Sequence, residues 1–514
     1  MKKPLERGLY YFHNHGHVTH PHLTGSQLTY TWAQIQPYGN GYNWGMIDGW
    51  VTQEKARGHK WVWRMDVHQN RGVISWPGWV PHVELTLADG RASFSPDYAS
   101  PVFQDKLVQV IRDVGAKYDS DPDLTLVQIG LGLYGETHPE RDDGQGNLMG
   151  QIYQKGLTAC EWIAYCKRIM AAYAEAFPTT ELVIMNATTY PFPCRDTEPP
   201  YTSRYAREEL DEYALELGIG AQNNSWDEWD NRWYTAEVAG TNGPYTVTGC
   251  VGPFERVGRM LAMERGSWLA PYNTHFQATG HQTWWSYLNG LSKGARILFP
   301  PNLPRKVWDE DHYIEFDAGV FGYPEDAPYA DALDLMHNWV MGALAGDTYI
   351  WAAFSTPTDT PWRQTSQTWD HEIGISCITE LPASWNVGVI EPPWYEGKYC
   401  RLLHGDAEFS IEPGTYNVTI FFNGAIDAFG EQDETYNGQW GSLSTTATVG
   451  DTFNVSGDCC YLHALIFEKI DEPDPPEPPA PPVDPPADEP IVLELPWPVF
   501  GYAWTVTGIK QEMK

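Results

Sequence analysis

Positively charged residues are scarce in this chain. Its 514 residues include 33 Lys and Arg against 67 Asp and Glu, a formal net charge of −34. A protein without a basic stripe cannot neutralise nucleic-acid phosphates, and a strongly acidic one is repelled by an anionic membrane surface. We therefore expect neither nucleic acid nor membrane among its partners, and we favour a neutral or cationic ligand.

Cysteine is scarce too, and long apolar runs are missing. The eight cysteines form no C-x-x-C pair and are too sparse for a disulfide scaffold, which argues against a cysteine-based metal site. Cys160 and Cys166 fall in one predicted helix, where we expect both in the core. No stretch approaches the ~18 consecutive apolar residues of a membrane helix. The opening MKKPLERGLYYFHNH shows no secretory signal.

Aromatic residues, in contrast, are abundant, with 24 Trp, 29 Tyr and 18 Phe. The simpler interpretation is a large contribution to the core. The more specific one is carbohydrate binding, because the apolar face of a sugar ring packs on a flat indole. For any single Trp, composition favours the core.

Short apolar runs alternate with helix-period segments over the first 300 residues. Ser100 before Pro101, and Thr158-x-x-Glu161, are helix-start signals. Eight apolar runs alternating with helices predict an α/β fold, a parallel (β/α)8 TIM barrel. The expected strands are Gly8–Phe12, Leu28–Ile35, Lys60–His68, Leu124–Leu133, Glu181–Asn186, Gly218–Asn223, Arg259–Glu264 and Ala295–Phe299.

The pattern changes after the barrel. Short alternating stretches separated by Gly, Pro and Asn predict a smaller antiparallel β-sandwich domain over residues 348–470, following a barrel domain of residues 1–347. Residues 471–490 contain ten prolines and seven acidic residues, which is typical of a stiff linker. Residues 491–514 form an aromatic C-terminal tail, a candidate for self-assembly or docking.

Function in such a barrel belongs at the carboxyl ends of its strands. The fourth predicted strand ends in GLGLYGETHP and places Glu136 there; the seventh ends in AMERG and places Glu264 there. Two carboxylates across a barrel mouth suit glycoside cleavage, in which one protonates the leaving oxygen and the other attacks or assists at the anomeric carbon. The alternative for each is a helix cap or an ion pair with an arginine such as Arg64, Arg141 or Arg265.

Other strand ends carry side chains suited to sugar hydroxyls and ring faces. For Asp66 we slightly favour an ion pair with Arg64 over a sugar contact, and for His20 and His22 a solvated loop. The candidate substrate-binding residues are His13, His15, Trp32, Gln34, Arg64, Asp66, His68, His138, Asn186, Asn223, Trp226 and Trp284.

The histidines of FHNHGHVTHPH also suggest a competing chemistry. Their His-x-His resembles the metal ligands of amidohydrolases, which are barrels as well. That chemistry needs further ligands, usually histidines after the fifth and sixth strands, where this chain offers Asn186 and Asn223. We therefore expect no catalytic metal and no cofactor.

The run TWAQIQPYGNGYNWGMIDGWVTQEKARGHKWVWRM resembles the second and third barrel units of clan A glycoside hydrolases, including β-galactosidase-like members. The run SPDYASPVFQDKLVQVIRDVGAKYDSDPDLTLVQIGLGLYGE is similar to their helix and fourth strand. The chain also resembles largely uncharacterised bacterial barrels with a C-terminal β-sandwich. The resemblance implies a retaining enzyme with Glu136 as acid/base and Glu264 as nucleophile. One departure is Gly135, where clan A usually has the Asn that contacts the sugar 2-hydroxyl.

These observations favour a glycoside hydrolase acting on a neutral oligo- or polysaccharide, a function that favours an extracellular or cell-surface location. The alternative is a non-catalytic carbohydrate-binding or assembly protein, for a fibre or surface array, on a barrel scaffold. A third is the metal-dependent hydrolase. The sandwich offers Trp385, Trp394 and Trp440 for sugar binding, although we expect it to brace the barrel.

Overall fold

The protein is described here by a computed structural model, in which the chain divides into a compact unit of residues 1–470 and a second unit of residues 471–514. The predicted linker and tail lie outside the described residues, and the domain boundaries stay predictions. The structure describes residues 2–12, 23–39, 41–69, 74–140, 146–186, 190–200, 203–226, 254, 257–265, 287–299, 330–355, 368–379, 381, 383–385, 399–434 and 441–470.

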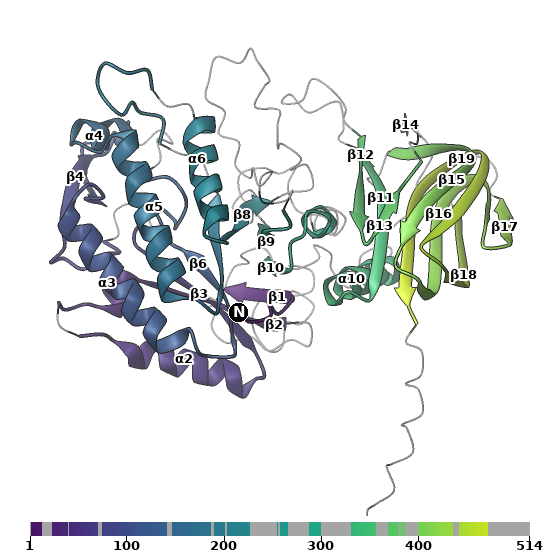
Figure 1. The fold of residues 1–514 in the computed structure, drawn as a ribbon, viewed down its shortest axis with the longest axis horizontal. Coiled ribbons are helices and arrows are strands. Elements are labelled where there is room, and N and C mark those ends of the chain that lie inside the picture. The colour runs from purple at the N-terminus through teal and green to yellow at the C-terminus, as the bar shows by residue number, and fades with distance from the viewer. Residues whose placement is uncertain are drawn as a thin grey trace, which may run out of the picture. The chain divides into compact units, whose positions relative to one another are not determined.

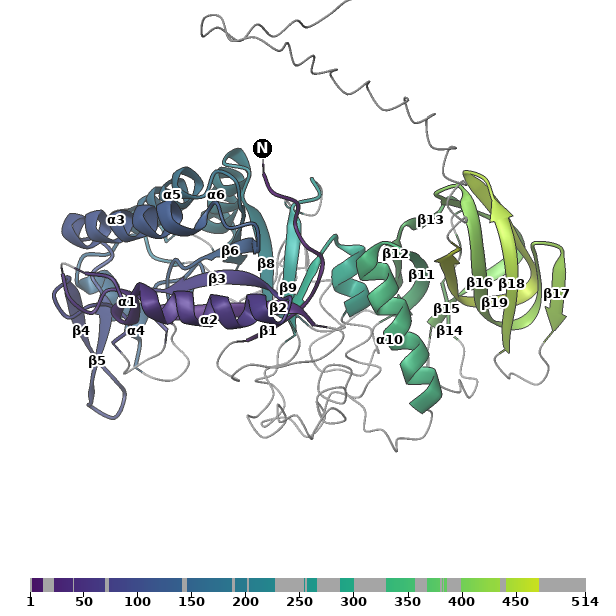
Figure 2. The same ribbon diagram turned by 90° about the horizontal axis from the view of Figure 1, so that it is seen from below.

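Eight parallel strands close into a barrel in the order β1-β10-β9-β8-β7-β6-β3-β2, which confirms the predicted TIM-barrel architecture (Figures 1 and 2). In chain order, β6 is the fourth barrel strand and β9 the seventh. The barrel strands are β1 Gly8–Phe12, β2 Leu23–Thr31, β3 Lys60–Asp66, β6 Leu124–Ile129, β7 Glu181–Asn186, β8 Gly220–Trp226, β9 Met260–Arg265 and β10 Ile297–Phe299.

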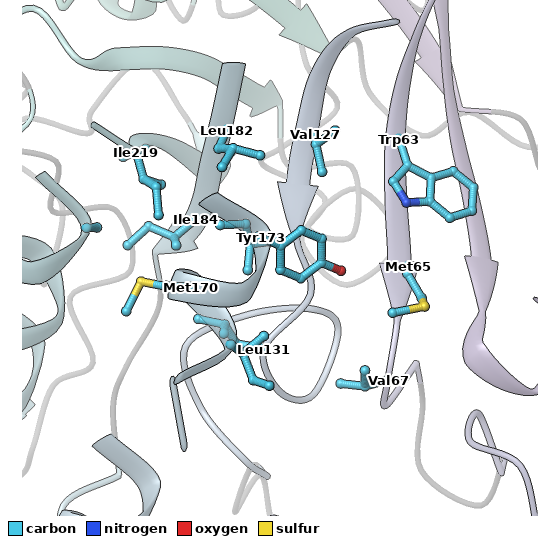
Figure 3. Close-up of a cluster of buried hydrophobic side chains, with 14 of the residues drawn as sticks. Trp63, Met65, Val67, Val127, Leu131, Met170, Tyr173, Leu182, Ile184 and Ile219 are labelled. Atoms are coloured by element: carbon cyan, nitrogen blue, oxygen red, sulfur yellow. The ribbon is translucent and has the colours of Figure 1, made fainter. Parts of the chain in front are cut away.

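The helices begin where the sequence signals them. Ser100 accepts a hydrogen bond from the Phe103 amide, with Pro101 in the first turn, and Thr158 and Glu161 form a capping box. The apolar faces of the helices pack on the outer side of the strands in one large core cluster, part of which is shown in Figure 3. The helices are α1 Trp32–Ile35, α2 Trp44–Ala56, α3 Pro101–Tyr118, α4 Leu148–Gln154, α5 Ala159–Ala176, α6 Ser203–Glu216 and α10 Ala330–Ala345.

The barrel interior has an apolar floor and a polar layer. The floor contains Tyr10, Val62, Leu126, Val183 and Phe299, all fully buried. The polar layer is a hydrogen-bonded chain across three strands, in which Gln27 donates to Gln128 (2.8 Å) and Gln128 donates to Gln222 (2.6 Å). The interior is therefore a packed core rather than a channel.

The second strand ends earlier than predicted. β2 stops at Thr31, and the following residues form the short helix α1, so Trp32 and Gln34 are helical and not at a strand end. The physical reason is a capping box, in which the Thr31 hydroxyl accepts from the Gln34 amide and the Gln34 side chain accepts from the Thr31 amide.

The loops after β3 and β7 contain structure that the sequence analysis did not predict. β4 His82–Thr86 and β5 Ala92–Pro96 form an antiparallel hairpin. A disulfide joins Cys160, at the start of α5, to Cys194. The expectation that Cys160 is a core residue is therefore wrong, because its side chain is at the surface and cross-linked, whereas Cys166 is fully buried.

The region after the barrel is antiparallel, and the predicted β-sandwich is confirmed. β11, β15, β16 and β19 carry most of its strand pairing and enclose a second apolar core. Trp385 contributes only its backbone to the described residues, and Trp394 and Trp440 lie outside them. The strands are β11 Thr348–Ser355, β12 Thr368–Ile373, β13 Ile375–Cys377, β14 Ala383–Trp385, β15 Tyr399–Ile411, β16 Gly414–Ala428, β17 Glu431–Glu434, β18 Gly441–Val449 and β19 Thr452–Lys469.

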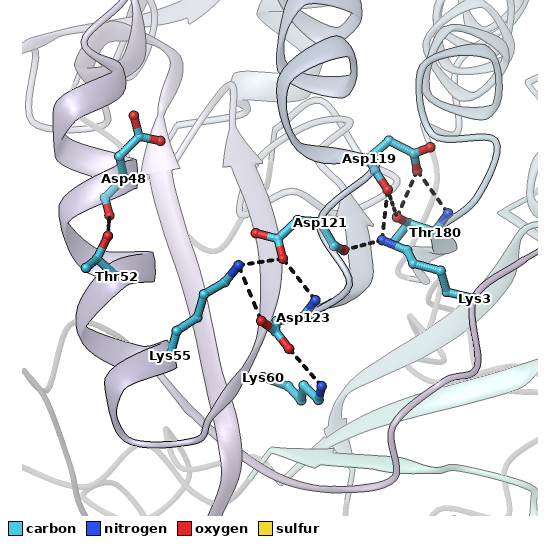
Figure 4. A network of polar contacts seen from close by, with 9 residues as sticks. All are labelled: Lys3, Asp48, Thr52, Lys55, Lys60, Asp119, Asp121, Asp123 and Thr180. Atoms are coloured by element: carbon cyan, nitrogen blue, oxygen red, sulfur yellow. Dashed lines mark hydrogen bonds and ion pairs between the residues drawn. The ribbon is translucent and has the colours of Figure 1, made fainter. Parts of the chain in front are cut away.

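A polar network holds the amino ends of the barrel strands together (Figure 4). The Asp119 carboxylate accepts hydrogen bonds from the amides and hydroxyls of Thr179 and Thr180, at 2.8–3.3 Å. The Lys3 ammonium donates to the carbonyls of Asp119 (2.9 Å) and Asp121 (2.6 Å). The polar contacts at the amino-terminal face of the barrel are therefore structural. In barrels of this kind the functional site lies at the carboxyl-terminal face.

Candidate active site

The candidate site begins at a tight turn just beyond β6. The Glu136 amide donates to the Leu133 carbonyl (3.1 Å), and the central residues Tyr134 and Gly135 have φ values of +58° and +78°. Single bridges join Leu133 to His68 beyond β3, and Glu136 to Met185 in β7. The turn therefore extends the barrel wall at its carboxyl end and presents Glu136 there.

Gly135 is required by this turn for two reasons. Its positive φ is a conformation that side chains rarely adopt, and a β-carbon there would overlap Cε of Met185 and lie 3.5 Å from Oδ1 of Asp66. The Asn that clan A enzymes usually carry at this position would have to displace Met185. The positive φ therefore favours glycine more strongly than does the contact with the flexible end of Met185.

Glu136 is nearly buried, with 8% of its surface exposed, and it is paired. Its Oε2 lies 2.8 Å from Nε2 of His138, whose own exposure is 2%. The other ring nitrogen, Nδ1, donates to the Glu140 carbonyl at 3.0 Å. His138 thus connects the Glu136 carboxyl group to the backbone of the same loop.

Behind this pair lies a set of fully buried polar side chains. His68 has zero exposure; its Nε2 is 3.8 Å from Oε2 of Glu140 and its Nδ1 is 3.3 Å from the Tyr98 hydroxyl. The Trp76 ring packs edge-on against His68. Burial raises the pKa of Tyr98 well above its ordinary value, so its hydroxyl stays neutral. His68, expected to contact sugar, instead lies in the wall behind the site.

The predicted Arg64–Asp66 ion pair is present. Arg64 Nε lies 2.8 Å from Asp66 Oδ1, and Nη2 donates to Oδ2 at 3.2 Å. Asp66 is fully buried, whereas the Arg64 side chain keeps 16% of its surface exposed. Burial raises the pKa of Asp66 above its ordinary value, and the Arg64 guanidinium opposes that rise. Of the two, only Arg64 is open to a ligand.

Three further candidates are placed differently from expectation. Trp32 is fully buried and donates from its indole to Gln36 (3.1 Å), while Gln34 is an exposed capping residue. Asn223 is fully buried beside Gln222, which points into the barrel, so strand alternation turns Asn223 toward the helix layer. Trp32 and Asn223 therefore do not face a ligand in this structure.

The remaining candidates are described only in part. Glu264 lies in β9 in register with Phe299 of β10, and Asn186 in β7 in register with Asn223 of β8. Trp226 ends β8. The side chains of Glu264, Asn186 and Trp226, and all of His13, His15 and Trp284, lie outside the described residues.

Two buried residues of the site were missed by the sequence analysis, Tyr98 and Glu140. The acidic Glu140 within the run GETHPE was a usable signal, but nothing local indicates that Tyr98 reaches His68. In the described part of the chain, no three His, Cys, Asp or Glu side chains gather in a way that suits a metal ion. None of the described helices has the length and apolar character to cross a membrane.

No protein-family model and no curated protein matches this chain. Similar solved structures include the catalytic domain of β-amylase from Paenibacillus polymyxa, with 9% identity, a TM-score of 0.37, and coverage of 63% of this chain and 100% of that one. Endo-glycoceramidase II from Rhodococcus sp. has 11% identity, a TM-score of 0.31, and coverage of 87% and 89%. Exo-β-1,4-mannosidase Op5Man5 from Opitutaceae bacterium strain TAV5 has 12% identity, a TM-score of 0.29, and coverage of 58% and 42%. Likenesses at these levels assign neither family nor reaction.

Proposed function

We propose that this protein is a glycoside hydrolase that cleaves a neutral oligo- or polysaccharide with retention of configuration. The observation that carries the proposal is the placement of Glu136. It is a nearly buried carboxyl group at the carboxyl end of the fourth barrel strand, held by His138 at 2.8 Å on a turn with two positive φ angles. Strain and burial of this kind concentrate at functional sites.

In this proposal Glu136 is the general acid/base. It gives a proton to the glycosidic oxygen as the bond to the anomeric carbon breaks, and later takes a proton from the attacking water. Glu264, in the seventh barrel strand, is the nucleophile that forms the glycosyl-enzyme. Retention and the role of Glu264 rest on the resemblance to clan A enzymes.

The substrate follows from charge and exposure. A net charge of −34 disfavours polyanionic sugars. Arg64 is partly exposed and is proposed to hydrogen-bond a sugar hydroxyl, anchored by Asp66. His13, His15, Asn186, Trp226 and Trp284 remain proposed substrate contacts.

The experiment is reducing-sugar release from a panel of neutral poly- and oligosaccharides. Wild type is compared with Glu136→Gln and Glu264→Gln, with the folding of each checked by thermal melting. Glu175→Gln is the matched control, because Glu175 is exposed on α5 and pairs only with Arg112 among the described residues. Loss in both site variants supports the proposal; activity that survives Glu264→Gln places the nucleophile elsewhere.

The competing function is a non-catalytic carbohydrate-binding or assembly protein. The Pro-rich linker and aromatic tail of residues 471–514 favour attachment or self-association. Sugar binding without hydrolysis by wild type would support this alternative. A solution mass that is a multiple of the chain mass for the full chain, and equal to one chain mass for a chain ending at Ile470, would support assembly through the tail.

A further inference from the structure

The hydrogen bonds of His138 restrict where its protons lie. A backbone carbonyl oxygen can only accept a hydrogen bond, so Nδ1 must carry a proton to donate to Glu140 at 3.0 Å. When Glu136 is ionised, its Oε2 is also an acceptor only, at 2.8 Å from Nε2. Both ring nitrogens are therefore engaged, Nδ1 with the Glu140 carbonyl and Nε2 with the Glu136 carboxyl group.

The position of the ring is fixed by its surroundings. His138 is 2% exposed, and the loop around it is tied down by backbone hydrogen bonds, including that from Leu133 to the His138 carbonyl (2.9 Å). A ring with both nitrogens engaged and no room to turn holds one carboxyl oxygen of Glu136 in place. Among the described residues, the charged or titratable groups around this loop include Arg64, Asp66, His68, Tyr98 and Glu140.

We propose that His138 is a positioning residue for Glu136, an inference that rests on the function proposed above. His138 binds Oε2 and so fixes the orientation of the carboxyl group that exchanges a proton with the substrate. In this cycle Glu136 gives its proton to the leaving oxygen as the glycosidic bond breaks and the Glu264 carboxylate bonds to the anomeric carbon, and His138 Nε2 faces the Glu136 carboxylate that is formed. Water then attacks the anomeric carbon, the bond to Glu264 breaks, and a proton of that water returns to Glu136.

This role predicts a dependence on the leaving group. A phenoxide leaving group needs protonation, whereas 2,4-dinitrophenolate departs without it. His138→Gln should therefore lower kcat/KM for a phenyl glycoside by about 10- to 100-fold, and for the 2,4-dinitrophenyl glycoside of the same sugar by less than about threefold. The probes are paired phenyl and 2,4-dinitrophenyl β-glycosides of glucose, galactose, mannose and xylose.

His82→Gln is the matched control. His82 is exposed on β4, and its Nδ1 also lies near a backbone carbonyl, that of Val80 at 3.3 Å. Its position in the hairpin takes no part in the proposed chemistry, so both substrates should be cleaved at the wild-type rate. An equal loss on both substrates in His138→Gln would overturn the positioning role.

A second measurement does not depend on activity or on a stable His138 variant. In protein labelled with ¹⁵N-histidine, the imidazole signals report which nitrogens are protonated. We expect a protonated Nδ1 in wild type and in Glu136→Gln, and a shifted Nε2 signal in Glu136→Gln only. An unprotonated Nδ1, or an unmoved Nε2, overturns the pairing. If the wild type cleaves neither these glycosides nor any poly- or oligosaccharide of the panel, the hydrolase proposal fails and the NMR result alone decides the pairing.

Discussion

Gly135 lies against the side chain of Met185, where the turn that carries Glu136 meets the end of β7. Gly135→Ala should destabilise the protein by about 1–3 kcal/mol through backbone strain, with an added cost from moving Met185. Gly58→Ala is a matched control, because Gly58 has the same φ of +78° and nothing within 4 Å of a β-carbon.

The two glycine variants are compared by urea denaturation. The difference between them measures the cost of the Met185 contact, and activity measured alongside reports whether Glu136 has moved. An equal loss of unfolding free energy in both variants would show that Met185 moves aside at no measurable cost. Packing against Met185 would then not explain why residue 135 is glycine.

The Cys160–Cys194 disulfide should stabilise the barrel substantially. It closes a loop with a sequence separation of 34 residues and ties the segment after β7 to the start of α5. The double substitution Cys160→Ser/Cys194→Ser should therefore cost about 2–4 kcal/mol, mainly through a freer unfolded chain. Cys377→Ser is the control: Cys377 is partly buried and outside any disulfide, and serine keeps a donor for the Thr379 carbonyl, so the melting temperature should change little. Equal melting temperatures for the double variant and wild type would contradict the prediction.

The buried tyrosines predict a loss of stability in alkali. Tyr98 and Tyr165 pack with ring centroids 5.0 Å apart, and burial raises the pKa of both well above the ordinary value. Below pH ~10 each is neutral in the folded and unfolded states, so neither affects the pH dependence. Above it the unfolded chain ionises first, and each tyrosine lowers stability by about 1.4 kcal/mol per pH unit.

This alkaline effect is measured by urea denaturation between pH 9 and pH 11 with absorbance at 295 nm. Tyr98→Phe removes one ionising group. The fall of the unfolding free energy with pH should therefore become shallower by the contribution of about one proton. An unchanged slope would show that Tyr98 ionises equally in the folded and unfolded states.

The Asp119 network should hold the amino-terminal face of the barrel together. Asp119→Ala removes the carboxylate that accepts from the Thr179 and Thr180 amides, while their hydroxyls keep the Asp119 carbonyl as an acceptor. We expect a loss of about 2–4 kcal/mol, with little effect on kcat because this face is opposite the site. Glu175→Ala, in an exposed pair with Arg112, should change stability by less than about 0.5 kcal/mol. A similar loss in both variants would contradict a special role for Asp119.

The barrel was predictable because apolar runs and helix caps are local signals. Ser100, Thr158 and Glu161 fix helix starts through neighbours three residues away. The predicted end of the second strand was wrong, although the same kind of signal was present. Thr31-x-x-Gln34 is a capping box, but it lies within an apolar run. Hydrophobicity alone does not separate a strand end from a single buried helical turn.

Residues of the site could be predicted only where the residue type and its place on one strand were sufficient. The position of Glu136 followed from the barrel register, and the Arg64–Asp66 pair from complementary charge on one strand. The burial of His68 did not follow, because its partners Tyr98 and Glu140 come from distant segments that meet only in the folded chain. The role of Gly135 likewise depends on Met185, which lies in β7 next to the turn and is distant in sequence.

The role of Glu136 is tested most directly by chemical rescue. Glu136→Ala is given a 2,4-dinitrophenyl glycoside that the wild type cleaves, with and without sodium azide. If Glu136 is the acid/base, the glycosyl-enzyme still forms from this substrate. Azide then attacks its anomeric carbon, a step that needs no general base. We expect a rate that rises with azide and a glycosyl azide of the same anomeric configuration as the substrate. Full activity of Glu136→Ala on phenyl glycosides, or no glycosyl azide in its products, would contradict the assignment.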